Sequence, residues 1–480
     1  MTASPYSPSS PVMRALWAMG LEALLTSSFD GVLILLQRAA RMYAYGSSTL
    51  VMALLFNTLG FSDTQLGAFM TLTLLGDVII SLLLTLVADK LGRRNMLMAG
   101  AGLMMFSGVV FAISSSYIIL LLAAIVGVIS PSGGEIGPFR ALEESIQAQL
   151  TPHNLRADIF AIGNMVGFLS AALGQVSIGW VVQTMTSSWG WSPLAAYRAV
   201  FWVYALCAAI KLGLTMLMSE ASEAEQQQKE EYMAVAADED IPLQQKELED
   251  EPDTPIPETP MPTTPSKLRM PKPTTLLSRI GSVFPALSPE SRSIVWKLCL
   301  LFILDNVASG LVPNSFVVYF FHQKFGLPTG VLGIIFSTTS IVQGISSLVA
   351  VAIAKQIGLV KTMVYTHLPS AVLLALVPAF PNVYLAATCL ILKASIQTMD
   401  KGPRTAFTAQ VVLQEERTSV MGFLNVVRTL GQAAGPWMAG WLSETGRLWM
   451  SFVVAGALQA LYDFGILAVF LNTKPRDGSA

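Results

Sequence analysis

Long apolar runs dominate this chain, and short polar stretches separate them. Most runs come close to the roughly 20 residues that a helix needs to cross the hydrocarbon core of a bilayer. They predict an all-α membrane protein with twelve transmembrane helices in two sets of six. The expected spans are 39–59, 65–88, 96–114, 117–149, 157–183, 196–218, 293–322, 328–353, 361–380, 383–411, 418–443 and 447–471.

Two segments outside these spans have a different character. Residues 12–37 are apolar, but Glu22 and Asp30 interrupt them, which favours an amphipathic helix on the membrane surface over a thirteenth span. Between Glu220 and Pro265 the chain has fourteen acidic residues, two basic ones and many prolines, a composition typical of disorder.

These patterns divide the chain into four expected units. They are 1–38, a cytoplasmic N-terminus with the interfacial helix; 39–218, a six-helix bundle; 219–292, an acidic, Pro-rich cytoplasmic loop; and 293–480, a second six-helix bundle with a short tail. Basic residues gather in the loops after the even-numbered spans, and Arg93 and Arg94 lie in the first of these. The positive-inside rule therefore predicts that both termini are cytoplasmic.

Composition supports a multi-pass membrane protein, because 53% of the residues are apolar and only 12% are charged. Soluble domains have about 25% charged residues. The net charge of −2 and the lack of a basic patch speak against nucleic acid as a partner. The three cysteines lie in apolar runs, and the three histidines form no cluster with cysteines or carboxylates along the chain. We therefore expect no metal site, no cofactor and no enzymatic activity.

The two halves of the chain repeat each other. Leu66-Gly67 recurs as Leu332-Gly333, and the same offset of 266 residues carries Gly92 onto Gly358. An offset of 261 residues superposes further pairs, which are Gln149 on Gln410, Arg156 on Arg417, Asn164 on Asn425, Gly174 on Gly435 and Gly179 on Gly440. Agreement over several spans indicates that both halves descend from one unit.

The loop between the second and third spans resembles the signature loop of the major facilitator superfamily. The family pattern is roughly G-x-x-x-D-R/K-x-G-R-R/K, and the matching residues here are Asp89, Lys90, Gly92, Arg93 and Arg94, with Thr85 in place of the first glycine. The resemblance implies a pseudo-symmetric pair of six-helix bundles around a central cavity lined by spans one, four, seven and ten. It also implies that these loop residues form a conformational latch against span eleven, and that the protein works as a monomer in the lipid bilayer.

Charged groups within the spans are the candidates for mechanism, since such groups are costly in a membrane and commonly functional. They include Asp77, Glu135, Arg140, Asp305, Lys393 and Arg428. Asp305 or Glu135, and then Asp77, would suit a proton, whereas Lys393 and Arg428 would suit an anionic group of a substrate. An interhelical salt bridge is the equal alternative for each. The pairs Arg140/Glu144 and Asp400/Arg404 are four residues apart and can neutralise themselves.

Breaks in matching spans point to a binding region. Gly137-Pro138, Gly402-Pro403 and Pro313-Asn314 predict such breaks in spans four, ten and seven. The candidates for lining the cavity are Tyr43, Tyr45, Asn57, Glu135, Asp305, Asn314 and Lys393.

We therefore expect a secondary active transporter of a small solute that works by alternating access, with protons as the coupling ion. The alternatives left open are a non-transporting membrane receptor that signals through the acidic loop, and an uncoupled facilitator. Symport and antiport, the solute, and the choice between a plasma and an organelle membrane also stay open.

Overall fold

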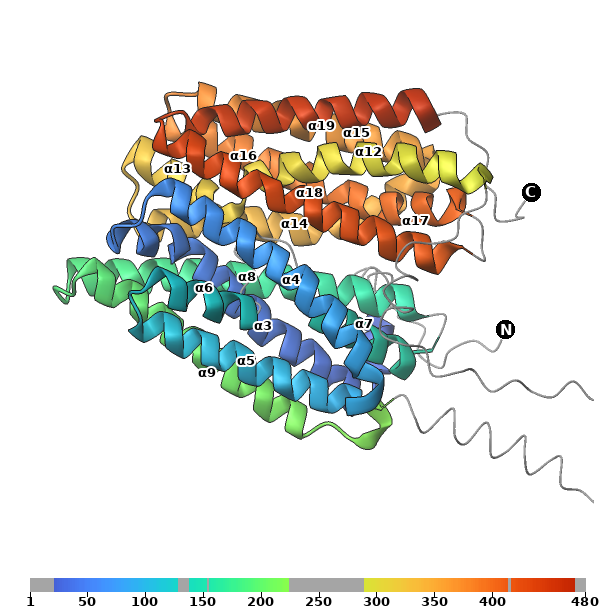
Figure 1. The fold of residues 1–480 in the computed structure, drawn as a ribbon, viewed down its shortest axis with the longest axis horizontal. Coiled ribbons are helices and arrows are strands. Elements are labelled where there is room, and N and C mark those ends of the chain that lie inside the picture. Colours follow the sequence, from blue (N-terminus) through green and yellow to red (C-terminus); the bar gives the residue numbers. More distant parts are fainter. Residues whose placement is uncertain (1–20, 128–137, 153–154, 224–288, 413–415, 471–480) are drawn as a thin grey trace, which may run out of the picture.

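The computed structural model describes residues 21–127, 138–152, 155–223, 289–412 and 416–470, and helices make up nearly all of this part (Figure 1). The N-terminal half contains α2 Leu21–Leu25, α3 Phe29–Thr58, α4 Asp63–Leu91, α5 Arg93–Ile113, α6 Tyr117–Val126, α7 Pro138–Leu150, α8 Arg156–Ser187, α9 Pro193–Met216 and the short 3₁₀ helix η2 Glu220–Ser222. The C-terminal half contains α12 Pro289–Leu311, α13 Asn314–Phe325, α14 Thr329–Ile357, α15 Leu359–Leu376, η3 Val377–Ala379, α16 Val383–Gln397, η4 Thr398–Asp400, α17 Lys401–Val411, α18 Arg417–Glu444 and α19 Leu448–Phe470.

Each predicted span has a helical counterpart, which confirms the architecture of two six-helix bundles. Nine spans are α3, α4, α5, α8, α9, α14, α15, α18 and α19. The seventh and tenth are broken near the predicted Gly/Pro positions: α12 and α13 form the seventh, and α16, η4 and α17 the tenth; α6 and α7 belong to the fourth. Residues 128–137, which include Glu135 and Gly137, lie outside the described part.

The helix of the first span, α3, begins ten residues before the predicted span. Residues 29–37 belong to α3 and continue into the predicted first span, residues 12–20 lie outside the described part, and the position of 12–37 on the membrane surface stays a prediction. Ser28 is the N-cap of α3 and accepts a hydrogen bond from the Gly31 amide. Asp30 in the first turn accepts hydrogen bonds from the backbone and side chain of Ser219. An acidic residue is favourable at a helix N-terminus, so Asp30 fits the first turn of α3.

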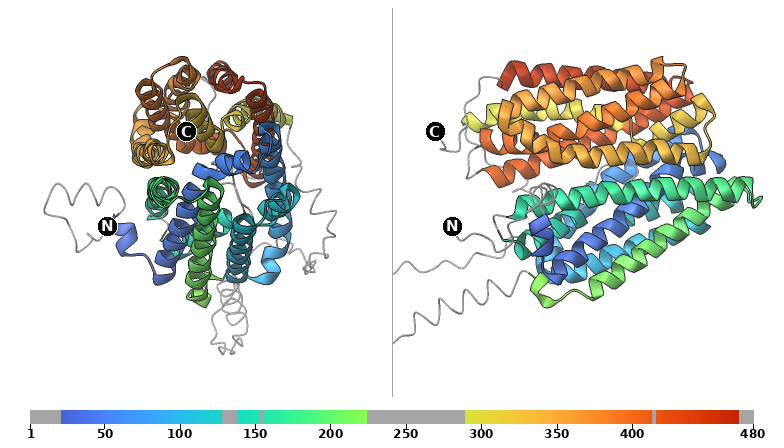
Figure 2. Two further views of the ribbon diagram at one scale, coloured as in Figure 1. Left: turned by 90° about the vertical axis from the view of Figure 1, so that its left-hand side faces the viewer. Right: turned by 180° about the vertical axis from the view of Figure 1, so that it is seen from behind.

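The two bundles lie side by side, with α8 packed against α14 and α4 against α18 (Figure 2). We call the end that carries the α4–α5 turn at Gly92 and the α14–α15 turn at Gly358 the inner end, and the opposite end the outer end. Both turn glycines have positive φ, of 80° and 86°, which explains why glycine recurs at the offset of 266 residues.

Among the described residues, the apolar core joins the halves at the outer end. There one continuous cluster contains Phe56 and Phe69 from the N-terminal half and Phe316 and Phe321 from the C-terminal half. Towards the inner end, the buried apolar residues of the described part form separate clusters within each half. The outer end is therefore the closed end of this conformation.

Two glycine pairs let the helices approach at the outer interface. A Cβ added to Gly440 would lie 3.0 Å from the Cα of Gly67 and 2.4 Å from the carbonyl oxygen of Asp63. On the other side, a Cβ added to Gly333 would lie 3.2 Å from the Cα of Gly179. The sequence repeat relates Gly67 to Gly333 and Gly179 to Gly440, so the two interfaces are built alike.

Candidate functional site

A buried ion cluster occupies the inner part of the C-terminal half. Arg404 on α17 donates a hydrogen bond of 2.5 Å from Nη1 to Oδ2 of Asp305 on α12. Its Nη2 group donates to Asp400 at the end of η4. The predicted self-neutralising pair Asp400/Arg404 therefore forms, but the same arginine also binds Asp305. The break before α17 allows Arg404 to reach both carboxylates.

His367 on α15 lies between two further carboxylate contacts. Its Nδ1 atom is 3.0 Å from Oδ2 of Asp463 on α19, and its Nε2 atom is 3.5 Å from Oδ1 of Asp305. His367 is 2% exposed, Asp305 3% and Asp463 0%. The expectation that no histidine clusters with carboxylates is therefore wrong for His367, because Asp305 and Asp463 are distant in sequence and are brought to it by helix packing.

Arg428 completes the cluster. Its guanidinium carbon lies 4.0 Å from the centre of the Phe302 ring, a cation–π contact. Within the described part, its Nε and Nη2 atoms are buried without a hydrogen-bond partner. The three aspartates Asp305, Asp400 and Asp463 thus face two arginines and one imidazole.

A second cluster in the N-terminal half has the opposite polarity. Glu143 on α7 accepts hydrogen bonds of 2.8 Å from Arg41 on α3 and of 2.8 Å from Lys211 on α9. The predicted pair Arg140/Glu144 also forms, at 2.8 Å, and is about one-third exposed. One buried carboxylate is therefore held between two cations here.

The two clusters occupy equivalent helices with inverted charge. The first span of each half contributes Arg41 on α3 and Asp305 on α12. The sixth span of each half contributes Lys211 on α9 and Asp463 on α19. The inner segment of the fourth span, α7, contributes Glu143, and the inner segment of the tenth span, α17, contributes Arg404. The sequence offset of 261 residues superposes these two residues. A sequence comparison of identical residues misses this relation because no charge is shared.

Two other charged candidates lie apart from the ion pairs. Asp77 on α4 is 1% exposed, and neither of its carboxylate oxygens has a hydrogen-bond partner within the described part. Lys393 on α16 is partly exposed, and among the described residues it forms no ion pair with the Asp305 cluster.

The candidates for lining the cavity separate into three groups. Tyr45 accepts a hydrogen bond of 3.2 Å from the Asn314 side chain, across the two halves and at the predicted break in span seven. Asn57 lies exposed at the outer end, where it donates to the Tyr319 hydroxyl over 3.0 Å. Tyr43 contacts Ser177 within its own half, at 2.8 Å. Of these residues, the structure therefore brings Tyr45 and Asn314 together at mid-depth.

Further hydrogen bonds between the halves lie above this point, towards the outer end. Ser340 donates to the Gln175 side chain over 2.9 Å, and Thr71 donates to the Ala433 carbonyl over 2.7 Å. At the outer end itself, Ser443 donates to Asp63 over 2.5 Å. Neutral side chains thus form most of these contacts.

Two of the predicted latch residues, Arg93 and Arg94, contact residues of their own half, and the predicted contact with span eleven stays a prediction. The Glu223 carboxylate accepts hydrogen bonds from the backbone amides of Arg93, at 2.7 Å, and Arg94, at 3.0 Å. The Arg93 side chain donates to Gln149 over 2.6 Å. A Cβ at Gly92 would approach the Glu223 carboxylate to 3.0 Å. The side chains of the other two latch residues, Asp89 and Lys90, lie outside the described part.

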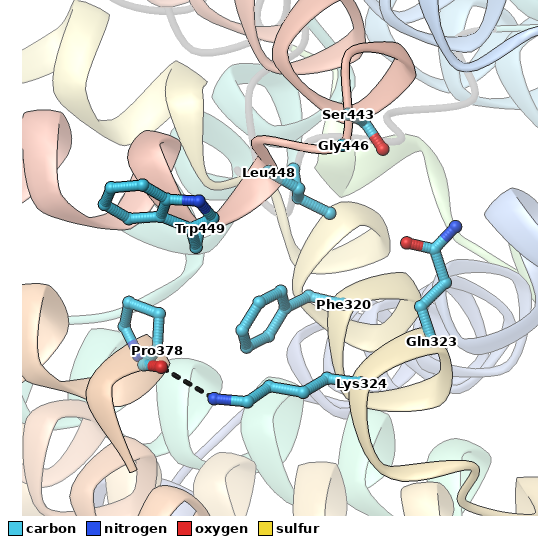
Figure 3. A pocket seen from close by; sticks show the side chains of 8 residues that line it. All are labelled: Phe320, Gln323, Lys324, Pro378, Ser443, Gly446, Leu448 and Trp449. Carbon is cyan, nitrogen blue, oxygen red and sulfur yellow. Dashed lines mark hydrogen bonds between the residues drawn. The ribbon is translucent and has the colours of Figure 1, made fainter. Parts of the chain in front are cut away.

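A pocket of about 370 Å³ opens at the outer end of the C-terminal half (Figure 3). It is lined by Phe320, Gln323, Lys324, Pro378, Ser443, Gly446, Leu448 and Trp449. The Lys324 ammonium group donates to the Pro378 carbonyl over 2.6 Å and to the Phe380 carbonyl over 2.8 Å. The pocket contains none of the residues of the ion clusters.

Comparisons with known proteins agree with this architecture. The Major Facilitator Superfamily profile matches residues 34–304 and 298–480. An uncharacterized membrane protein of Saccharomyces cerevisiae is 32% identical over 439 residues, which cover 91% of this chain and 93% of the relative.

Solved transporters share the fold at low sequence identity. The inward-open xylose transporter XylE of E. coli has a TM-score of 0.67 and 14% identity, with 94% of this chain and 97% of that chain covered. The nucleoside transporter NupG has a TM-score of 0.64 and 14% identity, with 93% and 100% covered. The paired six-helix bundles, the signature loop and the profile match over nearly the whole chain lead to one conclusion: this integral, multi-pass membrane protein belongs to the major facilitator superfamily of transporters.

Proposed function

We propose that the chain is a secondary active transporter that couples the movement of a small solute to the movement of protons by alternating access. The observation that carries the proposal is the buried cluster around His367 in the C-terminal half. The neighbours XylE and NupG, named for xylose and nucleosides, support a small solute as cargo. The inner end would face the cytoplasm, as the basic loops indicate.

The charges of the cluster explain why it would bind a proton. Asp305, Asp400 and Asp463 oppose Arg404 and Arg428, so these five groups leave one negative charge when all are ionised. A proton on His367 cancels this charge, and uncompensated charge is costly at low dielectric.

The geometry of His367 favours the same role. A protonated imidazole has two N–H donors, and each ring nitrogen of His367 faces a carboxylate, Asp463 on one side and Asp305 on the other. After the proton leaves, one ring nitrogen carries no hydrogen. This nitrogen and the carboxylate that it faces are then both acceptors, so their hydrogen bond is lost. The Tyr462 ring packs edge-to-face with the imidazole, and Arg404 lies over the Tyr462 ring in turn. Loss of the proton would therefore loosen α15 from α12 or α19, which links protonation to helix movement.

The N-terminal cluster offers no equivalent switch. Both oxygens of Glu143 are used by cations, one by Arg41 and one by Lys211, and Glu143 is 1% exposed. We infer that this cluster is a permanent clamp that fixes α7 against α3 and α9. Proton coupling would thus reside in one half of the molecule.

The experiment measures accumulation and exchange with the full chain in proteoliposomes. A pool of sugars, nucleosides, amino acids and carboxylates is offered with and without an imposed pH gradient, and the contents are identified by mass spectrometry. We expect at least one solute to accumulate with the gradient. His367→Gln should abolish accumulation but keep solute exchange without a gradient, and the control His322→Gln, at the outer end, should keep both.

Two results would contradict the proposal. Gradient-driven accumulation by His367→Gln at the wild-type level would remove the cluster from the coupling mechanism. Failure of every solute to accumulate or exchange, with protein shown to be folded by a single gel-filtration peak, would reject secondary transport.

A further inference from the structure

The pocket at the outer end of the C-terminal half has a fixed cation at its edge. The Lys324 ammonium group donates to the carbonyl oxygens of Pro378 and Phe380, at 2.6 and 2.8 Å. It also lies 5.5 Å from the centre of the Phe320 ring and 5.1 Å from that of Phe325, within the range of cation–π contacts. Lysine has a flexible stem, and these contacts hold it in one position.

The charge of Lys324 has no acidic partner within the described part of the chain, where its contacts are carbonyl groups and rings. Two acidic side chains at the outer end are bonded to other groups. Asp63 accepts a hydrogen bond from Ser443, and Glu444 accepts one from the Thr64 amide. An ammonium group has three N–H donors, so the two carbonyls leave one donor for a further acceptor. The pocket therefore offers an anion both a charge and a hydrogen bond.

The walls beside Lys324 are largely apolar (Figure 3). Phe320 and Leu448 are only 6% and 5% exposed, whereas Trp449 is 49% exposed. The Gln323 side chain adds a polar group on another side. The volume of about 370 Å³ lies near the lower end of the range for small-molecule sites, about 300–1,000 Å³. The pocket thus fits a small molecule with an apolar body.

The pocket is separate from the ion clusters of the two halves. All of its lining residues belong to the C-terminal half. Phe320 and Leu448 of its wall are part of the apolar cluster that closes the outer end. An occupant therefore contacts the outer side of this closed end, whereas the ion clusters lie towards the inner end.

From this arrangement we propose that the pocket is a second binding site, for an organic anion that has a carboxylate or phosphate group on an apolar body. The anionic group accepts a hydrogen bond from the remaining N–H of Lys324, and the apolar body packs against Phe320 and Trp449. A soluble amphiphile and the headgroup of an acidic lipid share this chemistry. The inference goes beyond the proposed transport function and does not depend on it.

The test measures thermal stabilisation of the purified full chain in an uncharged detergent. The soluble probes are benzoate, indole-3-acetate and octanoate, each compared with its neutral amide. The lipid probes are phosphatidylglycerol and the zwitterionic phosphatidylcholine. A ligand that binds the folded state raises the melting temperature by mass action. We expect at least one anionic probe to stabilise the protein more than its uncharged or zwitterionic counterpart, and this difference should shrink as salt screens the charge.

Variants then locate the site. Lys324→Gln should weaken binding of the anion about fivefold, the upper end of the range for an exposed ion pair. Trp449→Ala should also weaken it, because the apolar wall is lost. The shift is measured from the melting temperature of each variant without ligand, so lost stability is not counted as lost binding. The matched control is Lys361→Gln, which removes an exposed lysine near the α14–α15 turn and should bind like the wild type.

The outcomes separate this inference from the proposed function. Equal stabilisation by every anion and its counterpart, or no stabilisation by any probe, would overturn the anion site. An anion that stabilises Lys324→Gln as much as the wild type binds elsewhere, for example in the solute path, so the pocket would be wrong while transport stands. A Lys324-dependent effect of phosphatidylglycerol alone supports the site and assigns it to a lipid, and such an effect of the soluble anions alone assigns it to a soluble ligand.

Discussion

At the scale of single residues, the two ion clusters show how the same helical framework can hold a fixed contact in one half and a changeable one in the other. Glu143 has a cation on each oxygen, whereas His367 has a carboxylate beside each nitrogen. In the proposed mechanism, only the second arrangement changes its hydrogen bonds when one proton binds or leaves.

The clamp at Glu143 predicts a large loss of stability on neutralisation. Glu143→Gln leaves Arg41 and Lys211 facing each other in a buried site, and breaking a buried pair in this way costs about 3–5 kcal/mol. Thermal unfolding followed by gel filtration measures the effect.

Glu144→Gln is the matched control, because the neighbouring side chain is 37% exposed and pairs with Arg140 near the surface. Its cost should stay below about 1 kcal/mol. Equal melting temperatures for the two variants would show that Glu143 is not a clamp.

Residue-level prediction from the sequence reached the cluster only in part. Asp305 and Arg428 are recognisable as charges inside apolar runs, and Asp400/Arg404 as a pair one turn apart. His367 is 96 residues from Asp463, so nothing local relates them, and only packing of α15 against α19 reveals the contact.

At the scale of elements, helix ends and close approaches decide how the bundles are arranged. Asp30 looked like an interruption of an apolar run, but it lies in the first turn of α3, where an acidic residue is favourable. In contrast, span seven breaks at Pro313, where the sequence predicted it. Proline has no amide hydrogen, so it is tolerated at the start of a helix but interrupts a helix interior.

The glycine pairs at the outer interface predict that a larger side chain at either position prevents closure of the outer end. In Gly440→Ala, the new methyl group would lie 2.4 Å from the carbonyl oxygen of Asp63, so α18 must move away from α4. Cross-linking of cysteines placed at Asp63 and Ser443 should fall severalfold, and transport should fall with it.

Gly102→Ala on α5 is the control for this variant, since its Cβ would meet nothing within 4 Å. It should cross-link like the wild type and gain up to about 1 kcal/mol of helix stability. Undiminished cross-linking in Gly440→Ala would show that the outer end closes by other contacts.

Replacing Glu223 should destabilise the start of α5 to a degree that depends on the substitution. It serves two backbone amides that have no partner within the helix, so Glu223→Ala should cost about 1 kcal/mol, as for other lost caps. Glu223→Gln keeps an acceptor but loses the charge and should lie between. Hydrogen exchange at the Arg93 and Arg94 amides reports the change, and unchanged exchange in Glu223→Ala would exclude the cap.

At the scale of the whole molecule, the two-fold repeat places a closed interface at the outer end and separate cores at the inner end. The sequence predicted the number of spans, the breaks and the repeat, because these depend on periodicity and on glycine and proline. It could not predict which end is closed, since that depends on packing between residues hundreds of positions apart, such as Asn57 with Tyr319.

Closure of the outer end should depend on acid. Hydrogen bonds from Thr64, including its backbone amide, lower the pKa of the exposed Glu444 carboxyl below its ordinary value of 4.5. The ionised carboxylate therefore contributes its full stabilisation of the closed outer end above pH 4.5. This stabilisation is lost as the pH falls through the lowered pKa. Cross-linking between Asp63 and Ser443 positions should therefore weaken at strongly acidic pH, and less so in Glu444→Gln; equal acid dependence of both proteins would contradict the assignment.

The most direct test of proton-coupled transport is the proton movement that a solute causes. Proteoliposomes that contain the full chain and a pH-sensitive dye receive a solute that the accumulation experiment has identified, without an imposed gradient. We predict a solute-dependent pH change inside the vesicles that His367→Gln removes while solute exchange continues. Solute movement without any pH change in the wild type would contradict the account and indicate an uncoupled facilitator.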